Sequence, residues 1–110
     1  MADKISYTRG PWLLDNMTVY ALDETGSCNR FSAQVQWGFK HHSQGDKIDE
    51  RTSEDELTAN ARLIAAAPEL LEALETTLAN AKLFNRDTDL MWVAVRDKAE
   101  TAIAKARGEA

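Results

Sequence analysis

The residues that could carry chemistry are few in this chain, and none stands in a catalytic pattern. No serine lies in a G-x-S-x-G context, and the single cysteine, Cys28, has no predicted helix start or basic pair beside it. His41 and His42 are neighbours, so in an extended chain their side chains point apart, and no further ligand stands at a known spacing. The sequence therefore predicts no enzyme, no metal site and no cofactor.

The three tryptophans, Trp12, Trp37 and Trp92, could serve recognition, although a core position is the ordinary role of tryptophan and is expected for at least two of them. A basic and aromatic group is expected at one end of the predicted sheet, beside a polar loop: Arg30, Trp37, Lys40 and His41. Such side chains can stack on a base and bind phosphates, which makes this group a candidate nucleotide site.

Residues 11–39 must form the sheet that positions this group. The runs PWLLD, MTVYALD and RFSAQVQWGF are rich in strand-forming residues, and the last alternates apolar and polar positions from Phe31 to Phe39. Asp15 and Asn16 give a turn signal, and Gly26 suits a positive φ in the next connection. We predict a three-stranded antiparallel meander, with residues 4–8 as a candidate fourth strand.

Residues 53–83 are predicted to be helical, after a polar loop at 41–52. Ser53 and Glu56 have the spacing of a capping box. Apolar residues then recur seven apart at Leu57, Ile64, Leu71 and Leu78. Companion positions widen this stripe enough to pack on a sheet and on another helix.

Pro68 falls inside this apolar stripe. A proline within a helix removes a hydrogen bond and crowds the preceding turn. The helix must therefore kink near Pro68, or end so that a second helix begins there. The unbroken spacing favours a kink or a very tight break.

Residues 88–107 are predicted to form the last helix, between the turn residues Asn85 and Asp87 and the stop at Gly108. Its predicted stripe consists of Met91, Val95, Ala99, Ala102, Ile103 and Ala106. Alanines let helices approach closely, so the two helical segments are expected to form an antiparallel hairpin.

Some apolar residues exceed what a small sheet and one hairpin can cover: Leu63, Leu70, Leu83, Phe84 and Met91. A surplus of this kind usually meets a partner, so we expect these residues at an oligomer or partner interface.

Length and charge bound the class of protein. A chain of 110 residues fits one domain, here residues 1–110, with a sheet portion at 1–40 and a helical portion at 53–107. The net charge is −5, and residues 53–110 hold most of the acidic excess, which argues against direct DNA or RNA binding. Without a signal sequence or a membrane-length apolar run, the expected location is the cytoplasm.

Two motifs then point to a class of proteins. The stretch Arg9-Gly10-Pro11-Trp12 and the helix NARLIAAAPELLEAL at 60–74 resemble small phage and prophage proteins, which usually carry proline where Arg9 stands. The resemblance covers roughly residues 8–20 and 56–75 and brings no catalytic residue with it. It implies a non-enzymatic binding protein of phage origin, and it draws attention to Asn60 and Arg62. Both could hold an anionic ligand, or Asn60 could bond to backbone while Arg62 lies on the polar face.

We therefore predict an α+β fold and a phage counter-defence protein that acts by binding. In one mechanism, a homo-oligomer sequesters a nucleotide immune signal, with ligand residues at the junction of sheet and helix. In the alternative, the acidic and apolar helices dock on a host or phage protein and inhibit it.

Overall fold

The computed structural model describes residues 6–38 and 51–109, and it confirms the α+β class. The chain divides into two compact units, residues 8–67 and residues 68–110 with 1–7. The first unit holds the three strands and the first helix. The second holds the two remaining helices, so the division falls at Pro68, inside the predicted helical portion. The prediction of a single domain over 1–110 stays a prediction.

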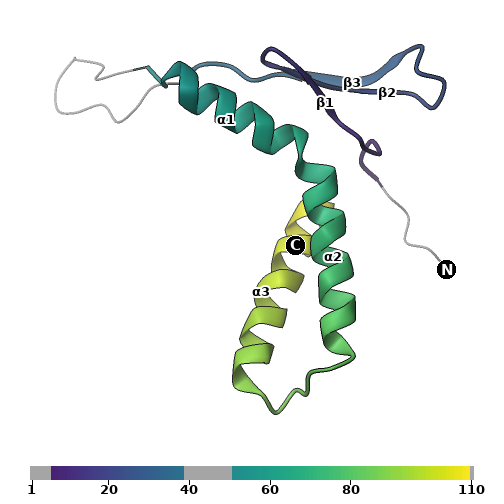
Figure 1. Cartoon of the computed structure of the whole chain (residues 1–110), viewed down its shortest axis with the longest axis vertical. Helices are drawn as coiled ribbons and strands as arrows, with labels where there is room; N and C mark the ends of the chain where they lie inside the picture. The colour runs from purple at the N-terminus through teal and green to yellow at the C-terminus, as the bar shows by residue number, and fades with distance from the viewer. Residues whose placement is uncertain (1–5, 39–50, 110) are drawn as a thin grey trace. The chain divides into compact units, whose positions relative to one another are not determined.

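The sheet is a three-stranded antiparallel meander in the order β1-β2-β3 (Figure 1). Its strands are β1 (Leu13–Asp15), β2 (Thr18–Leu22) and β3 (Asn29–Gln34). Asp15 pairs with Thr18 across a two-residue turn in which Asn16 has a φ of 58°. Asparagine tolerates this left-handed conformation better than most residues, which explains the turn signal in the sequence.

The connection from β2 to β3 is organised by Asp23. Its carboxylate accepts hydrogen bonds from the Thr25 hydroxyl at 2.8 Å and from the backbone N–H groups of Ser27 and Cys28. The Thr25 bond, followed by those backbone N–H groups, lowers the pKa of Asp23 below its usual value. Gly26 has a φ of 76°, as the sequence predicted.

Helix α1 (Glu54–Ala65) packs on one face of this sheet. Val19 and Ala21 on β2 and Ala61 on α1 are fully buried, and Leu57 is 2% exposed. Val19 and Ala21 are two residues apart on one strand, so they share the face that meets the helix. Apolar burial between α1 and β2 is the core of this unit.

The start of the sheet is held by Trp12. Its indole Nε1 donates a hydrogen bond to the carbonyl of Thr8 at 2.9 Å, and its ring lies 4.8 Å from that of Phe31 on β3. Trp12 is partly buried. This stretch belongs to the first motif, and its described contacts are internal to the sheet unit.

Two strand predictions need correction. The strand predicted through residue 39 ends at Gln34, and Trp37 is 43% exposed, not buried on the inner face. Residues 6–8 form no strand. Residues 4 and 5 and Phe39 lie outside the described residues.

The helix predicted over residues 53–83 is interrupted at Ala66, between α1 and α2 (Ala67–Lys82). Ser53 caps α1 by accepting a hydrogen bond from Glu56 N–H at 3.1 Å, as the capping box predicted. The Ala66 N–H still bonds back to Arg62 and Leu63. Pro68 then lies in the first turn of α2, where a helix needs no N–H donor. Of the two alternatives, the structure has the very tight break.

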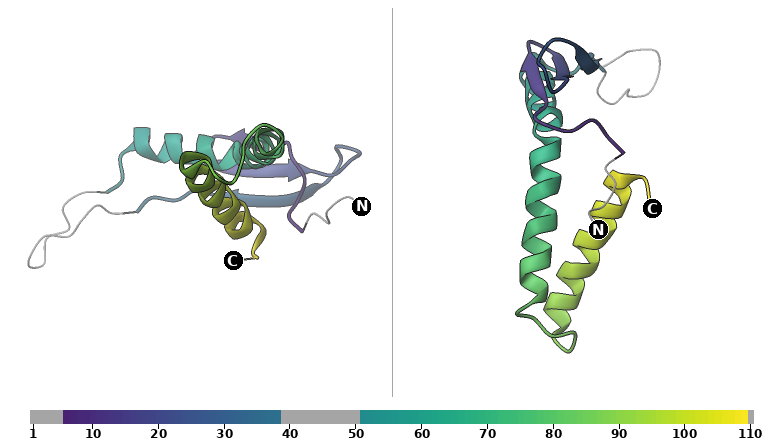
Figure 2. Two further views of the ribbon diagram at one scale, coloured as in Figure 1. Left: turned by 90° about the horizontal axis from the view of Figure 1, so that it is seen from below. Right: turned by 90° about the vertical axis from the view of Figure 1, so that its right-hand side faces the viewer.

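Helices α2 and α3 (Leu90–Arg107) form the predicted antiparallel hairpin (Figures 1 and 2). Asp89 caps α3 with bonds from Met91 and Trp92 N–H, and Gly108 ends it with a φ of 76°. The predicted stripe of α3 is partly wrong. Four members of the predicted stripe are exposed: Met91, Val95, Ala102 and Ala106. Ala99 and Ile103 do face α2, and Trp92 takes the inner position predicted for Met91.

Candidate functional site

The hairpin core fixes the positions of the surfaces around it. Leu78 on α2 meets Trp92 and Ala99 on α3, and each of the three is at most 9% exposed. Partly buried neighbours complete this cluster: Leu74, Ala81, Val93 and Ile103. Burial of these apolar groups is the main stabilising contribution to the antiparallel pair.

Ion pairs bridge the two helices beside this core. Arg107 Nε donates to Glu75 Oε2 at 2.9 Å, and both side chains are less than one third exposed. Lys82 Nζ lies 3.0 Å from Glu100 Oε2, with about half of each side chain exposed. The partly buried Glu75–Arg107 pair is the stronger of the two, because exposed pairs are screened by water.

A wide, open depression of about 680 Å³ lies near the closed end of the hairpin. Its lining consists of Lys82, Asn85, Arg86, Asp87, Trp92, Arg96 and Glu100. Arg96 is held by Asp87 at 2.6 Å and by Asp97. The Asp97 bond, then the charges of Asp87, Asp97 and Glu100, raise the pKa of Arg96. Lys82 and Arg96 are already paired with carboxylates, so Arg86 is the lining residue whose positive charge could meet an anion.

The closed end of the hairpin also exposes large apolar side chains. Leu83 is 76% exposed, Phe84 84% and Leu90 82%. We call these three residues the hairpin tip. Side chains of this size usually lie in a core, so three together on one short turn mark a candidate contact surface.

All five predicted interface residues are exposed: Leu63, Leu70, Leu83, Phe84 and Met91. Leu63 belongs to the sheet unit and the other four to the hairpin unit. Their role in an interface stays a prediction.

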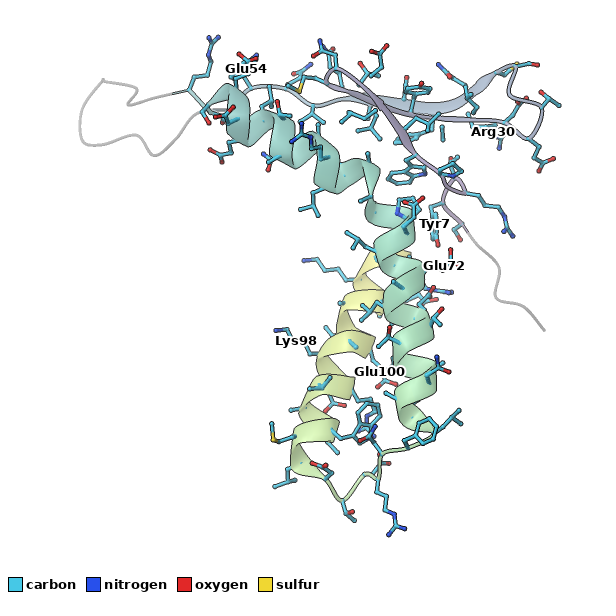
Figure 3. The ribbon with its side chains drawn as sticks, in the orientation of Figure 1. Tyr7, Arg30, Glu54, Glu72, Lys98 and Glu100 are labelled. Carbon is cyan, nitrogen blue, oxygen red and sulfur yellow. The ribbon has the colours of Figure 1, made fainter. Side chains whose placement is uncertain are left out.

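The predicted nucleotide group is not gathered in the described residues. Arg30 stands at the start of β3, next to the turn from β2, whereas Trp37 follows the other end of that strand. Figure 3 shows Arg30 at this turn and Glu54, the first residue of α1, far from it. The expectation that Arg30 and Trp37 share one end of the sheet is therefore wrong, because β3 separates them. Lys40 and His41 lie outside the described residues.

Trp37 instead meets Arg51, which the sequence reasoning missed. The guanidinium carbon of Arg51 lies 4.6 Å from the centre of the Trp37 ring, and Thr52 N–H donates to the Gly38 carbonyl at 2.8 Å. These contacts bring together residues on either side of a long polar run. No period in that run gives a register, so the sequence offered no signal for the pair.

Asn60 and Arg62 are both exposed on α1. Residues two apart on a helix point to nearly opposite sides, so these two side chains flank the buried Ala61 and do not converge. The first turn of α1 carries Glu54, Asp55 and Glu56, whose charges repel an anion from that helix end.

Comparison with protein families gives the chain its place. The family model of the Salmonella phage P22 protein Y8K6 matches residues 1–110. The chain belongs to this family. The phage origin that the sequence resemblance implied is confirmed at the level of the family. Curated proteins and solved structures gave no match to the chain.

In this Y8K6-family protein, the described residues contain no group of three or more His, Cys, Asp or Glu placed to hold a metal ion. Within the same residues, no helix has the length and apolar character needed to cross a membrane. Cys28 is exposed. The hairpin tip, the sides of the hairpin and the Trp37–Arg51 pair are the candidate binding surfaces.

Proposed function

We propose that this phage protein acts by binding another protein through the hairpin tip. The observation that carries the proposal is the exposure of Leu83, Phe84 and Leu90 by three quarters or more. Aromatic and aliphatic side chains of this kind are the usual anchors of protein interfaces, where they enter pockets on the partner. In a protein of a phage family, such binding would serve counter-defence if it inhibits a host protein, and the alternative target is another phage protein.

The charge around the tip supports a protein partner. Asp87 and Asp89 flank the loop, and the side chain of Asp87 is 78% exposed although it pairs with Arg96. An apolar centre with a charged rim is the ordinary composition of a protein interface. Because Arg86 in the same loop is also exposed, the partner surface would combine an apolar pocket with charged residues of both signs at its edge.

Site-specific photo-crosslinking tests this proposal. A photoreactive residue at position 84 should yield a discrete protein adduct when the chain is expressed in host bacteria. The same residue at Thr76, which is exposed on α2 away from the tip, is the matched control and should yield none. Equal adducts at both positions, or none at position 84, would count against the tip.

Sequestration of a nucleotide signal is the second candidate function. The half-exposed Trp37 ring with Arg51 beside it supports this reading, since both groups can stack on a base. The acidic first turn of α1 weighs against phosphate binding close by.

Calorimetric titration with cyclic and linear nucleotides checks this second candidate. Binding that Trp37→Ala or Arg62→Ala abolishes, with the folded signal retained, would support sequestration. Binding unchanged in Arg62→Ala would remove Arg62 from the site.

A further inference from the structure

We propose that a second copy of this chain covers one side of the helical hairpin, so that two hairpins form a four-helix bundle. This proposal goes beyond the partner proposed for the hairpin tip and uses other residues, so either can fail without the other. It starts from the small size of the hairpin core. Among the described residues, the buried cluster between the two helices consists of Leu78, Trp92 and Ala99, and two helices with so little burial are marginal without further packing.

The side to be covered is found from the ion pairs. Each of the four bridging charged residues follows an apolar residue in the sequence. These preceding residues are Leu74, Ala81, Ala99 and Ala106. Moving back by one residue turns the position by about 100° around the helix axis. In an antiparallel pair, this move leads to the same side of the pair on both helices. Ala99 belongs to the core, and Leu74 and Ala81 pack against it, so the apolar positions run from the core towards the edge opposite the ion pairs, where Ala106 is exposed.

Exposed residues extend this edge outward. Leu70 lies one turn before Leu74 and is 52% exposed, and Val95 lies one turn before Ala99 and is 60% exposed. Met91, one further turn back, is 79% exposed. We call the whole set the apolar side of the hairpin: Leu70, Leu74, Ala81, Met91, Val95, Ala102 and Ala106.

The distribution of charge favours a second copy of this chain as the partner on the apolar side. The apolar side contains no carboxylate, whereas the chain has a net charge of −5. Figure 3 shows Glu72 and Lys98 on the outer flanks of the two helices and Glu100 turned towards α2, where it meets Lys82. Two acidic chains repel one another through most of their surface, so they can meet closely only where the acidic residues are absent. Lys98 stands three residues after Val95 and four before Ala102, so an acidic chain such as a second copy meets a positive charge at the edge of this side.

The dimensions also suit a dimer. Helices of 16 and 18 residues give a side about 24 Å long and about 20 Å wide. Its exposed surface of several hundred Å² approaches the roughly 600–1000 Å² per partner that stable interfaces bury. The alanines on α3 allow the close approach of a facing helix, as in four-helix bundles.

Sedimentation equilibrium of the full chain in reducing buffer tests the proposal, since the exposed Cys28 could otherwise link two copies by a disulfide. The wild-type chain should show twice the monomer mass. Val95→Glu should raise the dimer dissociation constant at least about tenfold, because it buries a carboxylate in the interface. Ala94→Glu adds the same charge at the preceding residue, which is exposed and turned about 100° away around the helix axis. It should leave the dimer dissociation constant unchanged.

Met91→Lys provides a second variant if Val95→Glu loses helix content, because a residue 79% exposed at the start of α3 can change without unfolding the hairpin. It should also weaken the dimer. A wild-type chain that is monomeric at all concentrations would overturn the proposal. A dimer that both Val95→Glu and Met91→Lys leave intact would overturn it as well, because the interface would then lie elsewhere.

Discussion

Single side chains hold the sheet unit at two places, the chain before β1 and the connection between β2 and β3. Trp12 ties the chain before β1 to the sheet through the Thr8 carbonyl and the Phe31 ring. Asp23 closes the connection between β2 and β3 with three hydrogen bonds. Both act on local backbone, so each can be tested by a change that keeps the shape of the side chain.

Trp12→Phe removes the indole donor and keeps an aromatic ring against Phe31. We expect a loss of at least about 1 kcal/mol in the free energy of unfolding, because one hydrogen bond has about this net value and the smaller ring also fills less of the partly buried site. Urea unfolding followed by circular dichroism measures it. Trp37→Phe is the control, since the exposed Trp37 makes no hydrogen bond through its indole in the described residues, and its cost should be close to zero.

Asp23 makes the stability of the sheet unit depend on pH. Its folded-state pKa is lowered, so its contribution is complete above the unfolded value of about 4 and is lost as the pH falls through the folded value. Thermal melts of wild type between about pH 5 and pH 2 should therefore fall more steeply than those of Asp23→Asn. Parallel curves for the two proteins would show that the turn carries no such linkage.

At the scale of elements, α1 is held to the sheet by its inner face. Leu57→Ala opens a cavity against β2 and should cost about 2–5 kcal/mol in unfolding free energy. Leu63→Ala is the matched control on the same helix, where the side chain is 63% exposed, and should cost less than about 0.5 kcal/mol. Chemical denaturation of both variants gives the comparison, and equal losses would refute this packing.

The break between α1 and α2 comes from Pro68. Pro68→Ala restores an N–H that can bond to the Ile64 carbonyl, so we expect equal or higher helix content. The free energy of unfolding should change by less than about 1 kcal/mol, because proline in a first turn replaces no hydrogen bond. A large fall in melting temperature would mean that the packing requires the break.

Much of this architecture could be predicted from periodicity and caps. The meander, the capping box at Ser53 and the stop at Gly108 follow from local chemistry that acts within a few residues. The end of β3 and the inner face of α3 did not follow, because they depend on which neighbour packs against each residue. Apolar alternation continues past Gln34, but the pairing with β2 ends there, because Gln34 lies opposite Thr18 at the start of β2. Met91 and Val95 are as apolar as a core residue, although they are exposed.

The candidate sites could also be predicted from the sequence only in part. The surplus of apolar residues could be read from composition and spacing, because a small fold cannot bury them all. The contact between Arg51 and Trp37 could not be read, since it depends on how a long polar connection closes. Arg30 was misplaced for a related reason: a strand of six residues carries its two ends far apart.

At the scale of the whole molecule, the chain consists of a sheet unit and a hairpin unit, and the proposed binding surfaces lie on the hairpin unit. The hairpin tip and the apolar side expose aliphatic and aromatic groups, and three of the cations in this unit, Lys82, Arg96 and Arg107, are paired with carboxylates. Surfaces of this composition bind protein in preference to a phosphate-bearing ligand. The central claim is therefore that the protein acts through contacts with other chains.

Native mass spectrometry of the chain, taken gently from a bacterial lysate and again after mixing with cyclic and linear nucleotides, tests this claim most directly. The account predicts masses that correspond to whole chains, as a dimer of this protein or as a complex with another protein. The added nucleotides should leave these masses unchanged. A nucleotide-sized mass retained on the chain would contradict the account and return the search to Trp37 and Arg51.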